Sequence, residues 1–116
     1  MKHPLANIHP EAEVHETAVI EAFTTIQKDV VIGEGCWIGP NVTIWEGARL
    51  GKNVKVFPGA SVSSIPQDLK FEGERTTVEI GDNCTIREFA TLNRGTKASG
   101  KTSIGKNCLQ IGRAHV

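Results

Sequence analysis

The sequence has 116 residues, and 13 lysines and arginines balance 13 aspartates and glutamates, so the formal net charge is zero and no global field attracts nucleic acid. The longest apolar runs, such as Val30–Ile32, are far shorter than the roughly 20 residues that span a bilayer, so no integral membrane segment is expected. No apolar secretory signal follows Met1, and the cysteine count of three is odd, so we expect a cytoplasmic protein without a disulfide framework.

Aliphatic side chains recur every six residues from Ile8 onwards. Stepping by six from Ile8 meets an aliphatic residue every time as far as Val62. The same phase resumes later in the chain with Ile80, Ile86, Leu92 and Ile104. An α-helix advances about 100° per residue, so steps of six would fall on three stripes rather than one buried face. The period therefore excludes amphipathic helices and indicates a repeat architecture.

Each hexad predicts a short strand followed by a corner. If the aliphatic residue is position one, position five is mostly small or β-branched and lies two residues before the next position one, as side chains on one strand face do. Position four is glycine, asparagine or aspartate in nine hexads, at Asp29, Gly35, Asn41, Gly47, Asn53, Gly59, Asn83, Gly95 and Asn107. These residue types best tolerate the positive φ that a tight corner requires.

Equal strands and corners predict an all-β solenoid whose aliphatic residues stack in an interior column. The hexads resemble the hexapeptide repeat of left-handed parallel β-helix proteins. This resemblance implies a triangular coil of three hexads, or roughly 18 residues, and about six coils over the predicted domain, 1–110. Two stretches interrupt the pattern, and we expect loop excursions at about 63–79 and 95–101.

The cysteines and histidines are the candidates for metal or nucleophile chemistry. All the cysteines fall at position five: Cys36, Cys84 and Cys108. This common phase predicts small inward-facing side chains rather than metal ligands or nucleophiles. Three histidines lie six residues apart: His3, His9 and His15. Successive hexads face different sides of a triangular coil, so these rings cannot converge on one ion, and we expect surface or capping roles and no metal.

Aromatic side chains are few, and four of them occupy outward phases. They are Trp37, Trp45, Phe57 and Phe89. Because their phases assign them to different faces, we expect scattered exposure or burial beneath loops rather than an aromatic binding platform.

The first interruption gathers polar side chains next to one another. Gln67, Asp68 and Lys70 lie within four residues, directly after Pro66. A charged loop is usually only solvated, but a carboxylate can accept hydrogen bonds from sugar hydroxyls and a lysine can meet a phosphate. These three residues are therefore candidates for substrate binding.

Five short motifs in a fixed order carry a closer resemblance. They are Gln67–Phe71, Gly73–Glu74, Val78–Asp82, Ile86–Glu88 and Thr91–Thr96. The ordered set closely resembles the UDP-N-acetylglucosamine O-acyltransferases that begin lipid A synthesis. It covers the chain from Ile8 to Gln110, which corresponds to the first half of such an enzyme.

The resemblance implies a cytoplasmic homotrimer that moves a 3-hydroxyacyl group from acyl carrier protein to the 3-hydroxyl of UDP-N-acetylglucosamine. In that family a histidine acts as general base on the sugar hydroxyl, and neither a metal nor another cofactor is needed. By motif position, Asp68 would contact the sugar, while Gln67 and Lys70 would lie near the nucleotide-sugar or its phosphates in a cleft between subunits. Asn93 stands where some members carry a histidine and is the fourth candidate substrate-binding residue.

The last residues depart from the repeat. Gln110 occupies an aliphatic position, and Ile111–Val116 is the conceptual translation of a widely used sequencing adapter, ATCGGAAGAGCACACGTC. We therefore expect 111–116 to be a non-native tail, a hypothesis that uninterrupted genomic DNA encoding these six residues would contradict. The resemblance also places the catalytic histidine just beyond Asn107–Leu109, so we expect the 116-residue chain to be inactive by itself.

Three other functions stay open. The related N-acyltransferase of the same pathway shares the hexads, but Gln67–Lys70 and Arg94–Thr96 favour the O-acyltransferase. A structural or ice-binding solenoid would present an outward face of one residue type, whereas the outward positions here are mixed. A β-helical zinc hydratase would retain stoichiometric metal on purification.

Overall fold

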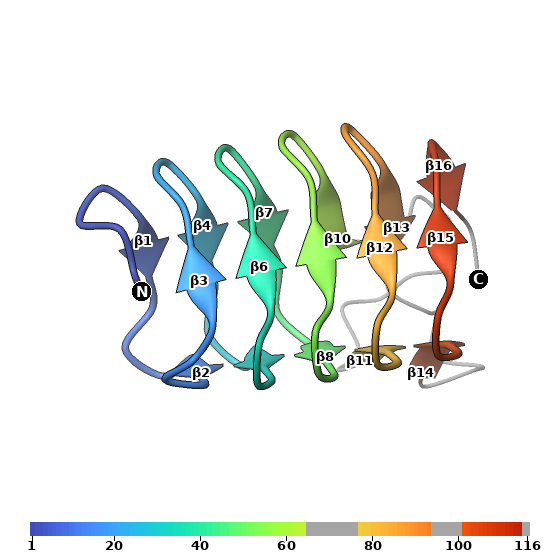
Figure 1. Ribbon diagram of the computed structural model, residues 1–116, viewed down its shortest axis with the longest axis horizontal. Helices are drawn as coiled ribbons and strands as arrows, with labels where there is room; N and C mark the ends of the chain where they lie inside the picture. The colour runs from blue at the N-terminus through green and yellow to red at the C-terminus, as the bar shows by residue number, and fades with distance from the viewer. Residues whose placement is uncertain (65–76, 94–100, 115–116) are drawn as a thin grey trace, which may run out of the picture.

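The computed structural model describes residues 1–64, 77–93 and 101–114, which form short strands joined by turns (Figure 1). In chain order the strands are β1 Asn7–Ile8, β2 Glu13–Val14, β3 Val19–Ile20, β4 Thr25–Ile26, β5 Val31–Ile32, β6 Trp37–Ile38, β7 Thr43–Ile44, β8 Ala48–Leu50, β9 Lys55–Val56, β10 Ser61–Ser64, β11 Thr77–Ile80, β12 Thr85–Ile86, β13 Thr91–Asn93, β14 Lys101–Ile104, β15 Leu109–Gln110 and β16 Arg113–Ala114. Within these ranges no helix is long and apolar enough to cross a membrane.

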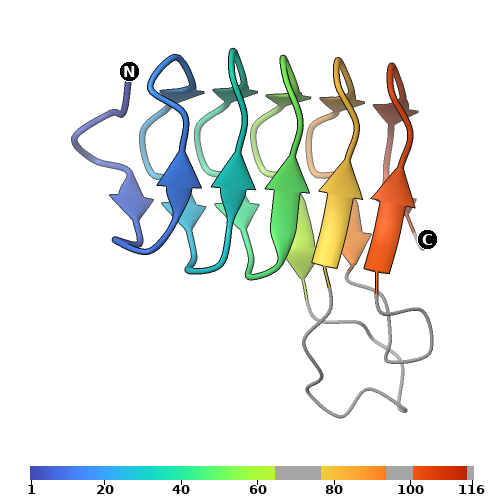
Figure 2. The same ribbon diagram turned by 90° about the horizontal axis from the view of Figure 1, so that it is seen from below.

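The strands form three parallel sheets in which every third strand is a neighbour. The first sheet has the order β1-β4-β7-β10-β13-β16, the second β14-β11-β8-β5-β2, and the third β15-β12-β9-β6-β3. Asn7 pairs with Thr25 and Ile8 with Ile26, so one coil takes three hexads. The coils follow one another along the long axis of the molecule (Figures 1 and 2). The fold is the predicted left-handed parallel β-helix.

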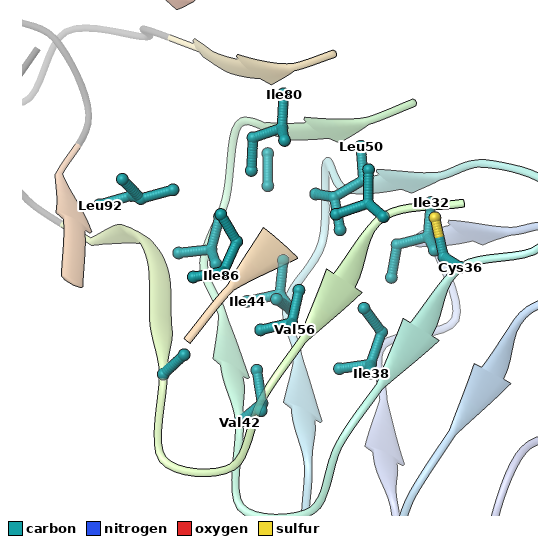
Figure 3. Close-up of a cluster of buried hydrophobic side chains, with 14 of the residues drawn as sticks. Ile32, Cys36, Ile38, Val42, Ile44, Leu50, Val56, Ile80, Ile86 and Leu92 are labelled. Atoms are coloured by element: carbon teal, nitrogen blue, oxygen red, sulfur yellow. The ribbon is translucent and has the colours of Figure 1, made fainter. Parts of the chain in front are cut away.

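Side chains at positions one and five fill the interior, as the periodicity predicts. Ile20, Ile38 and Ile44 at position one are fully buried, and Val42 and Val54 at position five are buried with them. Figure 3 shows aliphatic side chains from successive coils pointing into the space between the sheets. One continuous apolar column therefore runs through the described coils, and its burial is the main favourable term in folding.

Position four forms the corners. Positive φ occurs at eight of the predicted corners, at Asp29, Gly35, Asn41, Gly47, Asn53, Gly59, Asn83 and Asn107. The ninth, Gly95, lies outside the described residues. Phe23 and Phe89 also occupy position four and have φ values of 62° and 57°, although their residue type gives no such signal. The repeat therefore imposes the left-handed conformation even on bulky residues, against a cost of roughly 1–2 kcal/mol each.

Candidate functional site

Both interruptions of the repeat open at the same corner of the prism. The strands that precede them, β10 and β13, are neighbours in the first sheet, and the strands that follow, β11 and β14, are neighbours in the second. In Figure 2 the ends of these four strands lie together at the lower edge. The strand bounds extend further than the sequence indicated, because Ser63 and Ser64 belong to β10, and Thr77 and Val78 to β11, instead of to a loop.

Three of the four predicted site residues, Gln67, Asp68 and Lys70, lie outside the described residues, and their role stays a prediction. The fourth, Asn93, ends β13 at the shared corner. Its backbone stands in register with Ser64, the last residue of β10 before the first interruption. The fold therefore brings the backbone of Asn93 beside the start of the segment that carries the other three.

An open groove of about 400 Å³ lies on the outer face of the second sheet. Its lining comes from β8, β11, β14 and adjoining residues: Arg49, Leu50, Gly51, Glu79, Ile80, Gly81, Ser103 and Ile104. Gly51 and Gly81 directly follow β8 and β11, and Arg49 stands in register with Glu79. Sequence analysis missed this groove. The sequence feature that could have indicated it is a glycine at position two in four hexads of this sheet, at Gly33, Gly51, Gly81 and Gly105.

Arg49 is held at one end of the groove by Asp29. Its two terminal nitrogens each donate a hydrogen bond of 2.6 Å, Nη1 to the Asp29 carbonyl and Nη2 to the Asp29 Oδ1. Nη1 also donates to the Ala48 carbonyl at 3.0 Å. Because Asp29 balances this guanidinium and Glu79 adds a carboxylate, the groove has no excess positive charge with which to attract a phosphate.

The cysteines face inward, as predicted. Cys36 and Cys84 are buried, and Cys108 is partly buried against the same core. The Cys36 thiol donates to the Gly51 carbonyl at 3.0 Å and the Cys84 thiol to the Gly105 carbonyl at 2.8 Å. Burial raises the pKa of both the Cys36 and Cys84 thiols. Both therefore stay protonated at neutral pH, which is unsuited to a nucleophile or a metal ligand.

The histidines have the predicted capping role. Each ring accepts a backbone hydrogen bond at Nδ1 from the residue two positions ahead: Leu5 to His3 at 3.0 Å, Glu11 to His9 at 3.0 Å and Thr17 to His15 at 3.1 Å. These three turns lie at successive corners around the first coil. In the part of the chain that the structure describes, no three His, Cys, Asp or Glu side chains are grouped to hold a metal ion.

The expectation that the outward aromatic residues lie on different faces is wrong for one pair. Trp37 and Phe57 make an edge-to-face contact on the third sheet, with ring centroids 5.3 Å apart. The Arg87 guanidinium lies over the Phe57 ring at 4.4 Å from its centroid. Trp37 and Phe57 differ in phase but lie on adjacent coils, and Gly39 leaves the space into which the Trp37 ring leans. Phase counting within one hexad cannot detect such a diagonal contact.

Comparison with known proteins agrees with this fold. The family described as bacterial transferase hexapeptide (six repeats) matches residues 29–64. The acyl-[acyl-carrier-protein]--UDP-N-acetylglucosamine O-acyltransferase of Chlamydia caviae is 39% identical over 114 residues, which cover 98% of this chain and 41% of the relative. The enzyme of the same name from Campylobacter curvus is 43% identical over 116 residues, which cover 98% of this chain and 44% of the relative.

Solved structures give the same result. A UDP-N-acetylglucosamine acyltransferase from Bacteroides fragilis matches with a TM-score of 0.94 and 50% identity, over 97% of this chain and 44% of that one. The acyltransferase from Francisella novicida matches with a TM-score of 0.92 and 40% identity, over 98% of this chain and 41% of that one. The chain thus spans less than half the length of these relatives. Over the aligned residues, the chain is similar in sequence and in fold to UDP-N-acetylglucosamine O-acyltransferases.

Proposed function

We propose that the protein carrying this sequence is an acyltransferase that moves a 3-hydroxyacyl group from acyl carrier protein to the 3-hydroxyl of UDP-N-acetylglucosamine, the first step of lipid A biosynthesis. The observation that carries the proposal is the likeness to O-acyltransferases along nearly the whole chain, in sequence and in fold. The proposal includes a cytoplasmic location and a homotrimer, in which substrate is bound in a cleft between subunits.

The candidate substrate site is the corner at which both interruptions open. Asp68 accepts hydrogen bonds from the sugar, Gln67 and Lys70 lie near the nucleotide-sugar or its phosphates, and Asn93 borders them. Support comes from the register of β10 and β13, which sets the Asn93 backbone beside Ser64. Lysine suits this role because its ammonium is a compact point charge for a phosphate oxygen, whereas Arg49 is already engaged by Asp29.

The proposed reaction is an acyl transfer from sulfur to oxygen. The sugar hydroxyl attacks the thioester carbon, a C–O bond forms and the hydroxyl proton passes to a general base. The C–S bond then breaks, and acyl carrier protein leaves as its thiol after taking up the proton from the base. By resemblance to the family this base is a histidine that follows Leu109. The buried thiols of Cys36 and Cys84 take no part, because a neutral thiol enclosed in the core can reach no substrate.

The test uses the natural gene product that contains these residues. Purified protein is incubated with 3-hydroxyacyl-acyl carrier protein and UDP-N-acetylglucosamine, and the O-acylated sugar nucleotide is quantified by mass spectrometry. Absence of this product, or acylation only of the amino group of a 3-O-acylated glucosamine nucleotide, would overturn the proposal. The second outcome would favour the related N-acyltransferase.

Asp68→Ala tests the site within the same assay. We expect kcat/KM for UDP-N-acetylglucosamine to fall by at least roughly tenfold, because a hydrogen bond to a charged group contributes about 1.5–3 kcal/mol. Asp82→Asn is the control: the Asp82 carboxylate accepts a bond of 2.8 Å from the Lys52 backbone at a corner away from both interruptions. If the two variants lose activity equally, Asp68 has no specific role in binding.

A further inference from the structure

The turns that join the third sheet to the first form a continuous ridge along the molecule. They follow one another in a single row, seen at the upper edge of Figure 1. Backbone hydrogen bonds connect them from coil to coil, from the Phe23 N–H to the Leu5 carbonyl at 3.3 Å and from the Asn41 N–H to the Ala22 carbonyl at 3.2 Å. The corner ridge is defined here as positions three and four of these turns: Pro4–Leu5, Ala22–Phe23, Pro40–Asn41, Pro58–Gly59 and Glu88–Phe89.

The corner ridge differs in charge from the corner between the second and third sheets. On the corner ridge, position three holds proline or alanine except at Glu88. The Glu88 Oε1 lies 3.0 Å from the Arg87 Nε, so its charge is balanced. At the other corner, position three is charged in every described turn, at Glu16, Glu34, Lys52, Asp82 and Lys106. The corner ridge therefore carries no unbalanced charge among the residues that the structure describes.

The corner ridge exposes large apolar side chains. Leu5 is 58% exposed, Phe23 63% and Phe89 78%. Phe23 and Phe89 also have φ values of 62° and 57°, at which a side chain without a short polar group is strained. The Phe89 ring lies against the preceding coil, since a Cβ added to Gly59 would come within 2.4 Å of the Phe89 Cε1. In a single chain, most of this apolar surface faces water.

Both sheets beside the corner ridge are suited to contact with protein. On the third sheet, Phe57 directly precedes the ridge, contacts Trp37 and lies beneath the Arg87 guanidinium. Tryptophan and arginine are the residue types that most often anchor interfaces. On the first sheet, the position-six side chains are uncharged and stand in register from coil to coil: Asn7, Thr25, Thr43, Ser61 and Thr91.

A second copy of this chain suits the corner ridge better than an unrelated protein. In a ring of copies whose solenoids run parallel to the symmetry axis, each ridge residue lies at the same height as its equivalent in every neighbour. A charged ridge would set like charges against one another, which a neutral ridge avoids. The spacing between coils, about 4.8 Å, is equal in all copies, so Phe23 and Phe89 meet their own equivalents at the same time. Contacts between aromatic rings then add to the burial of apolar surface.

We propose that the corner ridge is the surface through which copies of this chain associate, parallel and in register, around a common axis. Leu5, Phe23 and Phe89 are its anchors, and association removes their side chains from water. The inference rests on the proposed function for the homotrimer. It deepens that proposal by assigning the residues that meet at the axis.

Cysteine cross-linking tests the contact in the natural gene product that contains these residues. Phe23→Cys and Phe89→Cys are each oxidised with copper phenanthroline in the absence of substrate, and covalent dimers are measured on non-reducing gels. We expect several-fold more dimer in both variants than in the parent, which controls for the native cysteines. Asn83→Cys, at an exposed position four of another corner, is the matched control. Dimer at the control level in either ridge variant would overturn the proposal.

Co-expression of the two ridge variants with different tags tests the register. Phe23 and Phe89 are separated by three steps between coils, or roughly 14 Å, so copies in register cannot form a disulfide between the two variants. Only disulfides between identical variants are therefore expected. A mixed disulfide joining a Phe23→Cys chain to a Phe89→Cys chain would show that the copies are not in register and contradict the proposed arrangement.

Phe89→Glu tests the charge argument by analytical ultracentrifugation. Its carboxylates would meet at the axis, so the dissociation constant of the assembly should rise at least roughly tenfold, because opposed like charges are strongly unfavourable. Asn83→Glu is the control and should associate like the parent. Phe89→Asn, which tolerates positive φ, replaces Phe89→Glu if that variant folds poorly, and it should also weaken association. A monomeric parent, or unchanged association in both Phe89 variants, would refute the inference.

The same variants separate this inference from the proposed function. A protein that cross-links at both ridge positions but does not acylate UDP-N-acetylglucosamine would refute the function and keep the corner ridge as the interface. Acyl transfer by a parent protein whose Phe23→Cys and Phe89→Cys variants do not cross-link would keep the function and refute the interface.

Discussion

At the scale of single residues, the corners set the shape of the molecule. Asn41 has a φ of 57° while its backbone N–H donates to the Ala22 carbonyl at 3.2 Å, so one residue both turns the chain and joins two coils. Asparagine tolerates this conformation better than residues without a short polar side chain. Phe23 and Phe89 adopt it too, which shows that stacking between coils outweighs local preference.

Asn41→Ala should therefore destabilise the protein by about 1 kcal/mol, because alanine pays the steric cost of the left-handed region. Asn41→Gly should cost less than half of that, since glycine has no such penalty. Urea unfolding measures both changes in the free energy of unfolding. The slope of that free energy against urea concentration should be the same in all variants. Asn7→Ala, at an exposed strand position, is the control and should be neutral. Equal losses for Asn41→Ala and Asn41→Gly would show that the side chain, not the backbone conformation, matters.

At the scale of the strands, close stacking requires glycine after several strands of the second sheet. A Cβ added to Gly33 would lie 2.6 Å from the Gly51 carbonyl oxygen, and one added to Gly81 would lie 2.8 Å from backbone atoms of Gly105 and Lys106. Real Cβ atoms do not approach backbone so closely.

Gly33→Ala should destabilise the protein by about 1–3 kcal/mol, because the coils cannot separate locally without loss of strand pairing. Asn7→Ala, at an exposed strand position, is again the control. Its effect should stay within about 0.5 kcal/mol. Thermal unfolding of both variants decides the matter, and a small effect at Gly33 would mean that the coils adjust more easily than their backbone contacts suggest.

At the scale of the whole molecule, stability passes from coil to coil. Each coil of a solenoid contacts only its neighbours, so an interior residue is enclosed from both sides while a residue of the first coil has a neighbour on one side. Ile38 is fully buried, whereas Ile8 in β1 is only partly buried against the core. The two isoleucines occupy the same position of the repeat.

Ile38→Ala should consequently cost about 2–5 kcal/mol, the usual range for a buried isoleucine in a packed core. Ile8→Ala should cost less than half as much, because less apolar surface becomes exposed and solvent already reaches the site. Chemical denaturation monitored by far-UV circular dichroism gives both values. Similar losses at the two positions would contradict this expectation and indicate that the first coil is packed as tightly as the interior coils.

The repeat made most of the fold predictable. Spacing by six places Ile20, Ile38 and Val56 in one interior column, and a side chain period of two assigns Cys36 and Cys84 to the same interior, because a strand has only two faces. The candidate site was harder to predict from the sequence. Gln67, Asp68 and Lys70 were chosen for their chemistry and by resemblance, and no periodic rule says what an interruption of the repeat contacts.

The sequence by itself determined the hexad, the corner positions and the side that each side chain faces, because these follow from local backbone geometry repeated many times. The sequence predicted which hexads become neighbours only by resemblance, and the tertiary structure decided it. That stacking sets Ser64 opposite Asn93, the Ser63 hydroxyl on the Glu46 carbonyl, and Trp37 against Phe57. Each contact joins residues 17 to 29 positions apart in different coils, and such contacts depend on coil closure rather than on any local preference.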